Sequence, residues 1–126
     1  MFKVTYYKVR WNKYLRWEEA WRCKKVAEIK ILSGRLSIGK GFYMNRGSYI
    51  AVVDGGNATI GKNVNINRHS MIVCQDSITI GNDCSIGPNV LIYDHDHKFG
   101  AQGMKKGHNK SPVSIGNQCW IGGGAM

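Results

Sequence analysis

The sequence predicts an all-β solenoid, in which short parallel strands wind around a three-sided prism. Aliphatic residues recur six positions apart over much of the stretch from residue 34 onward, and a small or polar residue follows most of them. The chain also holds 16 glycines against two prolines, which is typical of a fold with many turns. A period of six fits neither a helix of about 3.6 residues per turn nor the alternation of a simple strand. Three such units complete one coil, so about four coils are expected.

The repeat assigns one aliphatic residue to each face of each coil. Its positions are Ile38, Met44 and Ile50, then Ile60, Ile66 and Ile72, then Ile80, Ile86 and Ile92, and finally Ile115 and Ile121. Two further columns of small or apolar side chains accompany them, namely Leu36, Ala58, Ile78 and Val113, and Val64, Cys84 and Cys119. Glycine or asparagine after the aliphatic residues, and the triplets at 61–63 and 81–83, are expected at corners with positive φ. A meander of ordinary hairpins is the alternative, but hairpin spacing normally drifts.

Residues 1–33 are expected to form a basic, aromatic segment that precedes the solenoid of residues 34–126. Aromatic residues at Tyr7, Trp11, Tyr14 and Trp21 follow steps of four, three and seven, with Lys and Arg around them. This spacing predicts an amphipathic helix near residues 10–25. Such a helix would cap the first coil. The alternative is peripheral contact of residues 7–25 with a membrane surface, which Trp with Lys and Arg favours.

The formal net charge of +10 favours anionic partners. No nucleic-acid-binding motif accompanies the charge, so nucleic acid is not expected as a partner. The first residues lack the apolar region of a secretion signal, and no apolar stretch reaches the length of a membrane span. A cytoplasmic protein is therefore expected, with peripheral attachment at the inner face of the membrane left open. The four separated cysteines (Cys23, Cys74, Cys84 and Cys119) are expected to be reduced.

The repeat is interrupted after the third coil, and this interruption is the expected position of a functional site. The coil ends in Tyr93-Asp94-His95-Asp96-His97, and the polar, basic residues 98–111 that follow show no aliphatic period. A long loop leaving a rigid scaffold is a preferred place for function. Histidine suits a general base near neutral pH, because its reference pKa is about 6.5.

The units IGKNVN, INRHSM, IGNDCS, IGPNVL and IGNQCW resemble those of the hexapeptide-repeat acetyltransferases, above all the maltose and galactoside acetyltransferases and the capsular or O-antigen O-acetyltransferases. The resemblance covers roughly residues 34–126. It implies a left-handed parallel β-helix, an exception to the usual right-handed crossover. It also implies a homotrimer, acetyl-CoA as co-substrate, no metal, and transfer of an acetyl group to a hydroxyl of a sugar or polysaccharide, as in polysaccharide biosynthesis.

The same resemblance assigns roles to single residues. His97 takes the position of the catalytic base before Pro112 and the Ile115-Gly116 to Trp120 segment, and His95 is the rival for that role. It further implies that Asn67 binds the acceptor and that Trp120 lines the acceptor and thioester region. In some relatives a loop glutamate orients the catalytic histidine, but residues 98–111 contain no acid, so Asp94, Asp96 or a backbone carbonyl would hold the ring here, and both aspartates are also candidate acceptor-binding residues. Gly122 and Gly123 are expected to lie against acetyl-CoA, because glycine lets a ligand approach the backbone closely. The imidazole would take the hydroxyl proton, and the oxygen would attack the thioester directly.

Two other readings stay open at this point. The family continues through further coils after the Trp-Ile-Gly segment, so the C-terminal coils are expected to be missing and a non-catalytic trimer is the first alternative. The second is a zinc enzyme similar to the γ-class carbonic anhydrases, with His69, His95, His97 and His108 as the candidate ligands. The spaced histidine pair of that class is absent from the sequence.

Overall fold

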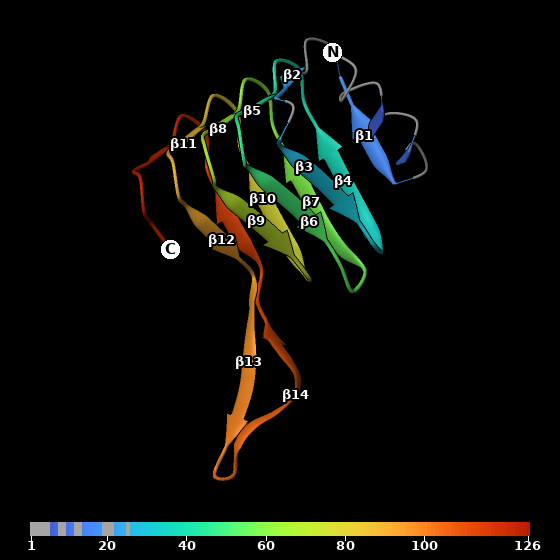
Figure 1. Ribbon diagram of the computed structural model, residues 1–126, viewed down its shortest axis with the longest axis vertical. Helices are drawn as coiled ribbons and strands as arrows, with labels where there is room; N and C mark the ends of the chain where they lie inside the picture. Colours follow the sequence, from blue (N-terminus) through green and yellow to red (C-terminus); the bar gives the residue numbers. More distant parts are fainter. Residues whose placement is uncertain (1–5, 8–9, 12–13, 19–21, 25) are drawn as a thin grey trace.

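The computed structural model describes residues 6–7, 10–11, 14–18, 22–24 and 26–126. These residues form a β-solenoid of three parallel sheets, from which one β-hairpin projects (Figure 1). Each complete coil contributes one short strand to each sheet, and the last coil adds only β15 (Val113–Ile115) and β16 (Trp120–Ile121), so successive strands of a sheet come from successive coils. The predicted all-β solenoid of about four coils is confirmed.

The three sheets form the three faces of the prism. Sheet A consists of β1 (Leu15–Trp17), β4 (Gly34–Ile38), β7 (Gly56–Ile60), β10 (Ser77–Ile80) and β15 (Val113–Ile115). Sheet B consists of β2 (Arg22–Cys23), β5 (Tyr43–Met44), β8 (Asn65–Ile66), β11 (Ser85–Ile86) and β16 (Trp120–Ile121). Sheet C consists of β3 (Glu28–Ile31), β6 (Tyr49–Val52), β9 (Met71–Cys74) and β12 (Leu91–Tyr93).

The aliphatic columns lie in the register that the period of six predicts. In sheet A, Ile60 pairs with Ile38, Ile80 with Ile60 and Ile115 with Ile80. The other sheets align Met44, Ile66, Ile86 and Ile121, and Ile50, Ile72 and Ile92. From Ile38 to Ile92 these side chains are buried inside the prism, and burying each one removes apolar surface that would otherwise contact water.

The expected helix near residues 10–25 is present at its start, where Arg10 is helical, but it is wrong for the strands that the structure describes further along. Leu15–Trp17 and Arg22–Cys23 are strands, and with Glu28–Ile31 they form a coil of their own in front of residue 34. The physical reason is that a new coil gains backbone hydrogen bonds and burial from the coil next to it, which outweighs local helical spacing. Trp21, one of the predicted stripe, lies outside the described residues.

Two aromatic side chains ahead of this coil pack onto its third strand. The buried Tyr7 hydroxyl donates to the Ala27 carbonyl at 3.1 Å and accepts from the Ile29 N–H at 2.9 Å. The Trp11 indole N–H donates to the Ile29 carbonyl at 3.2 Å. Both rings therefore face the solenoid. Across the described residues, no helix has the length and apolar character needed to cross a membrane.

The residues with positive φ at the corners of the prism agree only in part with the prediction. Asn63 and Asp83, the last residues of the two triplets, have φ of 54° and 58° as predicted. The glycines directly after the aliphatic residues do not have positive φ. Gly61, for example, is not among the described residues with this conformation. A Cβ at Gly61 would instead lie 2.7 Å from the Gly81 carbonyl carbon of the next coil. Close stacking of the coils, not backbone conformation, requires glycine at this point.

Residues 98–111 were expected to be a loop, but most of them belong to a β-hairpin. β13 (His95–Gly100) and β14 (Gly103–Lys110) are antiparallel, with Gly100 opposite Gly103 and a register shift between His97 and Lys98. The hairpin extends away from the prism where β12 ends (Figure 1). Its strands are almost wholly exposed, so no buried face gives them an apolar pattern.

Candidate active site at the root of the hairpin

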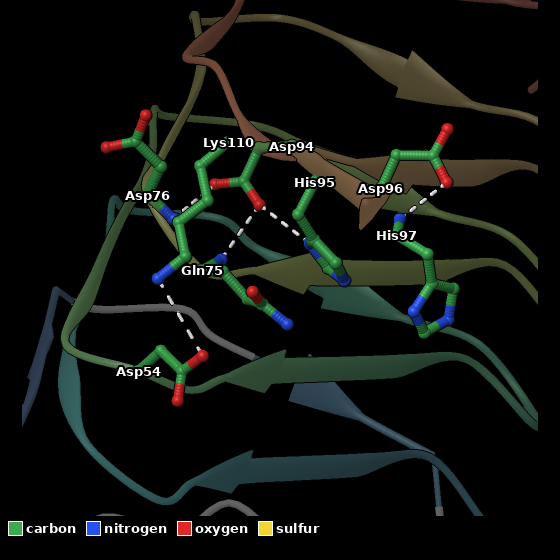
Figure 2. A network of polar contacts seen from close by, with 8 residues as sticks. All are labelled: Asp54, Gln75, Asp76, Asp94, His95, Asp96, His97 and Lys110. Atoms are coloured by element: carbon green, nitrogen blue, oxygen red, sulfur yellow. Dashed lines mark hydrogen bonds and ion pairs between the residues drawn. The ribbon is translucent and has the colours of Figure 1, made fainter. Parts of the chain in front are cut away.

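A buried carboxylate joins the hairpin to the coil before it. Asp94 follows β12, and its side chain turns into the corner between β9 and β10 (Figure 2). Its Oδ1 accepts the Gln75 N–H at 2.8 Å, and its Oδ2 accepts the Asp76 N–H at 2.7 Å. The side chain of Asp94 is fully buried, and both of its oxygens therefore find donors inside the protein.

These donors keep Asp94 ionised. Burial alone would raise its pKa, but the hydrogen bonds from Gln75, His95 and Asp76 outweigh that effect and hold the pKa below its usual range. The neighbouring thiol responds in the opposite direction. Burial, and then the negative charge of Asp94, raise the pKa of Cys74 to about 12.

The hairpin joins the prism at residues 95–97 and 108–110, which are called the hairpin root here. Three histidine rings lie on one face of this root. His95 Nδ1 lies 3.0 Å from Asp94 Oδ1, and the ring stacks on Tyr93 with centroids 5.4 Å apart. The His108 ring meets His95 edge-on at 5.4 Å and His97 at 4.8 Å. His97 and His108 are direct partners across the hairpin. The strand alternation places these three rings on one face because His95 and His97 are two residues apart.

The second carboxylate of the motif does not hold an imidazole. Asp96 is exposed, and its Oδ1 accepts the backbone N–H of His97 at 2.8 Å, so the carboxylate stays on its own strand (Figure 2). His97 is exposed as well. His108 was expected from the sequence only as a candidate metal ligand, not as a neighbour of His97. The two glycines that flank a two-residue turn, Gly100 and Gly103, were the available signal for a hairpin that returns His108 to this point.

Asn67 and Trp120 line a different place, a groove of about 200 Å³ on sheet B. The Asn67 Oδ1 accepts the Arg68 N–H at 2.7 Å and the Asn45 Nδ2 at 3.3 Å. The indole of Trp120 is 79% exposed, so it is open to a ligand. Gly122 follows Ile121 as Asn67 follows Ile66, and these two isoleucines share one column. A Cβ at Gly122 would have no atom within 4 Å, whereas one at Gly123 would lie 3.3 Å from Pro88.

The two groups of candidate residues lie near opposite ends of the strands of sheet C. Asn67 precedes β9, and His95 and His97 follow β12. Because β9 and β12 are parallel neighbours, the start of one and the end of the other lie a full strand length apart. Within one chain the structure thus brings Asp94, His95, Asp96 and His97 together, and separately brings together Asn67 and Trp120.

His69, a candidate ligand in the zinc alternative, lies apart from the other histidines at the corner before β9, with φ of 59°. In the part of the chain that the structure describes, no three His, Cys, Asp or Glu side chains are arranged to hold a metal ion.

The four cysteine thiols are expected to divide into two classes of reactivity. Cys74 and Cys84 are buried, and Cys23 and Cys119 are partly exposed. Native protein treated with a maleimide near neutral pH should be alkylated at Cys23 and Cys119 and spared at Cys74, whose high pKa also keeps it protonated. Peptide mass mapping before and after denaturation measures this. Equal alkylation of Cys74 and Cys119 in the native protein would contradict the packing described for this corner.

Comparison with known proteins gives relatives that match 54–57% of the chain. The chain is 42% identical over 73 residues to nodulation protein L of Rhizobium leguminosarum bv. viciae, covering 57% of the chain and 38% of that protein. Nodulation protein L of Rhizobium meliloti is 38% identical over 73 residues, covering 57% and 40%. Galactoside O-acetyltransferase of Escherichia coli is 38% identical over 69 residues, covering 54% and 34%.

The matched segment spans less than half the length of each of these relatives. No family model matches the chain. No solved structure matches it either. The chain is thus a β-solenoid protein that is similar in sequence to the nodulation proteins L and to a galactoside O-acetyltransferase, and these findings agree with the resemblance to the hexapeptide-repeat acetyltransferases.

Proposed function

We propose that the chain carries the catalytic half-sites of an O-acetyltransferase, which moves an acetyl group from acetyl-CoA to a hydroxyl of a sugar or polysaccharide. The observation that carries the proposal is the cluster of imidazoles at the root of the hairpin, anchored by an ionised, buried carboxylate. The similarity to a galactoside O-acetyltransferase supports the reaction and the acceptor class.

His97 is the proposed general base, because its position matches the base of the enzymes that the sequence resembles. Its imidazole takes the proton of the acceptor hydroxyl while the oxygen attacks the thioester carbonyl carbon. The carbon–sulfur bond breaks, the sulfur leaves with the electron pair, and the imidazolium returns the proton to it. The acetyl group is thus transferred in one displacement, without an acetylated side chain. His95 is the rival base, and its contact with Asp94 supports it.

The acceptor and the acyl donor are proposed to meet between two copies of the chain. Asn67 and Trp120 line the groove on sheet B, near the start of the sheet C strands, and the histidines follow the end of β12 in sheet C. A neighbouring prism in a homotrimer can set the groove of one copy against the hairpin root of the next. Gly122 and Gly123 are proposed to lie against acetyl-CoA, because glycine has no side chain to keep a ligand from the backbone.

The test combines activity with complementation between subunits. The full chain is incubated with acetyl-CoA and a panel of galactosides, glucosides and oligosaccharides, and the acetylated product is detected by mass spectrometry. Acceptor-dependent product is expected. His97→Ala and Asn67→Ala should each be nearly inactive alone, but mixing them through an unfolding and refolding cycle should restore part of the activity, since mixed trimers contain intact interfaces. Absence of product together with absence of CoA binding by calorimetry would favour an inert scaffold.

A further inference from the structure

The acid in the Asp94-His95 pair faces inward, which separates it from any acceptor. Its oxygens are occupied by the backbone N–H groups of Gln75 and Asp76, at 2.8 and 2.7 Å, and its side chain is fully buried. A fully buried carboxylate in that place is not available to a sugar hydroxyl outside the prism. The side chain of Asp94 also contacts His95, whose Nδ1 lies 3.0 Å from Asp94 Oδ1.

The contact with Asp94 selects one tautomer of His95. An ionised carboxylate only accepts hydrogen bonds, so the Nδ1 atom of a neutral His95 ring must carry the proton. The Nε2 lone pair is then free and directed away from Asp94 (Figure 2). The side chain of His95 is 10% exposed, so few other orientations are open to the ring.

The orientation of His95 reaches the other imidazoles through direct ring contacts. His95 is held between Tyr93 and His108, and His108 also contacts His97. A second attachment joins the hairpin to an earlier coil, where Lys110, the cross-strand partner of His95, has its Nζ 3.7 Å from Asp54 Oδ2. Both side chains of this pair are partly exposed, so its contribution to stability is expected to be small.

We infer that Asp94 is a positioning residue, which fixes the tautomer and orientation of His95 and, through His95 and His108, the orientation of His97. The inference rests on the proposed acetyl transfer for its kinetic consequence, but not for its structural one. It assigns Asp94 a role behind the imidazoles rather than against the acceptor, and it assigns His108 the role of the link between His95 and His97.

The tautomer is measured first, because it needs no activity. Long-range proton–nitrogen NMR correlations of the imidazole-labelled full chain should show a protonated Nδ1 and an unprotonated Nε2 for His95, assigned by its loss in His95→Asn. Asp94→Asn should shift the ring toward the Nε2-protonated form, since the amide can donate to Nδ1. Asp54→Asn is the matched control, which removes one negative charge from the other attachment and should leave the spectrum unchanged.

Kinetics then separate positioning from simple attachment of the hairpin. Asp94→Asn is expected to lower kcat by about 10-fold to 10²-fold with little change in KM, the scale of a misplaced catalytic group. His95→Asn keeps a donor where Nδ1 was, so it preserves the bond to Asp94 while removing the ring. A comparable loss of kcat in His95→Asn supports the inference. Wild-type kcat in His95→Asn would mean that Asp94 merely anchors the hairpin.

The possible failures are distinguishable. A wild-type His95 that is protonated at Nε2 overturns the inference whatever the activity. If wild-type protein transfers no acetyl group but His95 shows the Nδ1–H tautomer, the proposed function fails and the structural part of the inference stands. Should Asp94→Asn not fold, the wild-type tautomer and the His95→Asn kinetics still decide the question.

Discussion

His97→Ala is expected to lower the turnover of acetyl transfer by roughly 10²-fold to 10⁴-fold, which is the usual contribution of a general acid–base group. The ring is exposed on the hairpin and makes its described contact with His108, so its removal leaves the solenoid core intact. The fold and the far-UV spectrum should therefore be unchanged. Initial rates at saturating acetyl-CoA, with acetylated sugar as the measured product, give the ratio.

Two comparisons test whether the loss is chemical. Asn109 pairs with Asp96 on the other face of the same hairpin, so Asn109→Ala removes a polar side chain there and should keep most of the activity. Added imidazole should restore part of the turnover of His97→Ala, because the position is open to solvent. If His97→Ala is fully active while His95→Ala is inactive, the base is His95, and the carboxylate contact would then act on the base directly.

The solenoid could be predicted because the residues that form its side-chain columns recur at a fixed spacing in the sequence. Ile60 and Ile80, for example, lie 20 residues apart and pair directly in sheet A. The first coil was missed although its residues keep the same spacing: Trp17, Cys23 and Ile29 pair with Ile38, Met44 and Ile50. Two of the three are not aliphatic, so the column is recognised only when the next coil lies beside it.

The candidate site was predictable in its residue types but not in its contacts. A histidine-rich sequence at a break in the repeat indicates a base, and the break does mark the root of the hairpin. The sequence does not reveal that the N–H groups of Gln75 and Asp76 face Asp94, since these lie 19 and 18 residues earlier. Nor does it align His108 with His97, because that pairing depends on a register shift in the hairpin.

Gly34→Ala is expected to destabilise the fold by about 3 kcal/mol or more, because two independent costs coincide. Gly34 has φ of 109°, a conformation that side chains rarely adopt. A Cβ there would also lie 2.1 Å from the carbonyl oxygen of Gly56, its partner in the next coil. Neither backbone can move away, since β4 and β7 are paired along their whole length and are covered by the next coils.

Two other glycines separate these costs. Gly55 has φ of 74°, and a Cβ at this position would have no atom within 4 Å. Gly55→Ala should therefore lower the free energy of unfolding only by the cost of the left-handed conformation, about 1 kcal/mol. Gly61 is not among the described glycines with positive φ, but a Cβ there would lie 2.7 Å from the Gly81 carbonyl carbon, so Gly61→Ala tests the close contact alone and should cost about 1–3 kcal/mol. Urea unfolding followed by circular dichroism, at one protein concentration because association shifts apparent stability, gives the three free energies. If Gly34→Ala costs no more than Gly55→Ala, the coils are not stacked as closely as the Gly34–Gly56 contact requires, and the columns that position the hairpin root are looser than described.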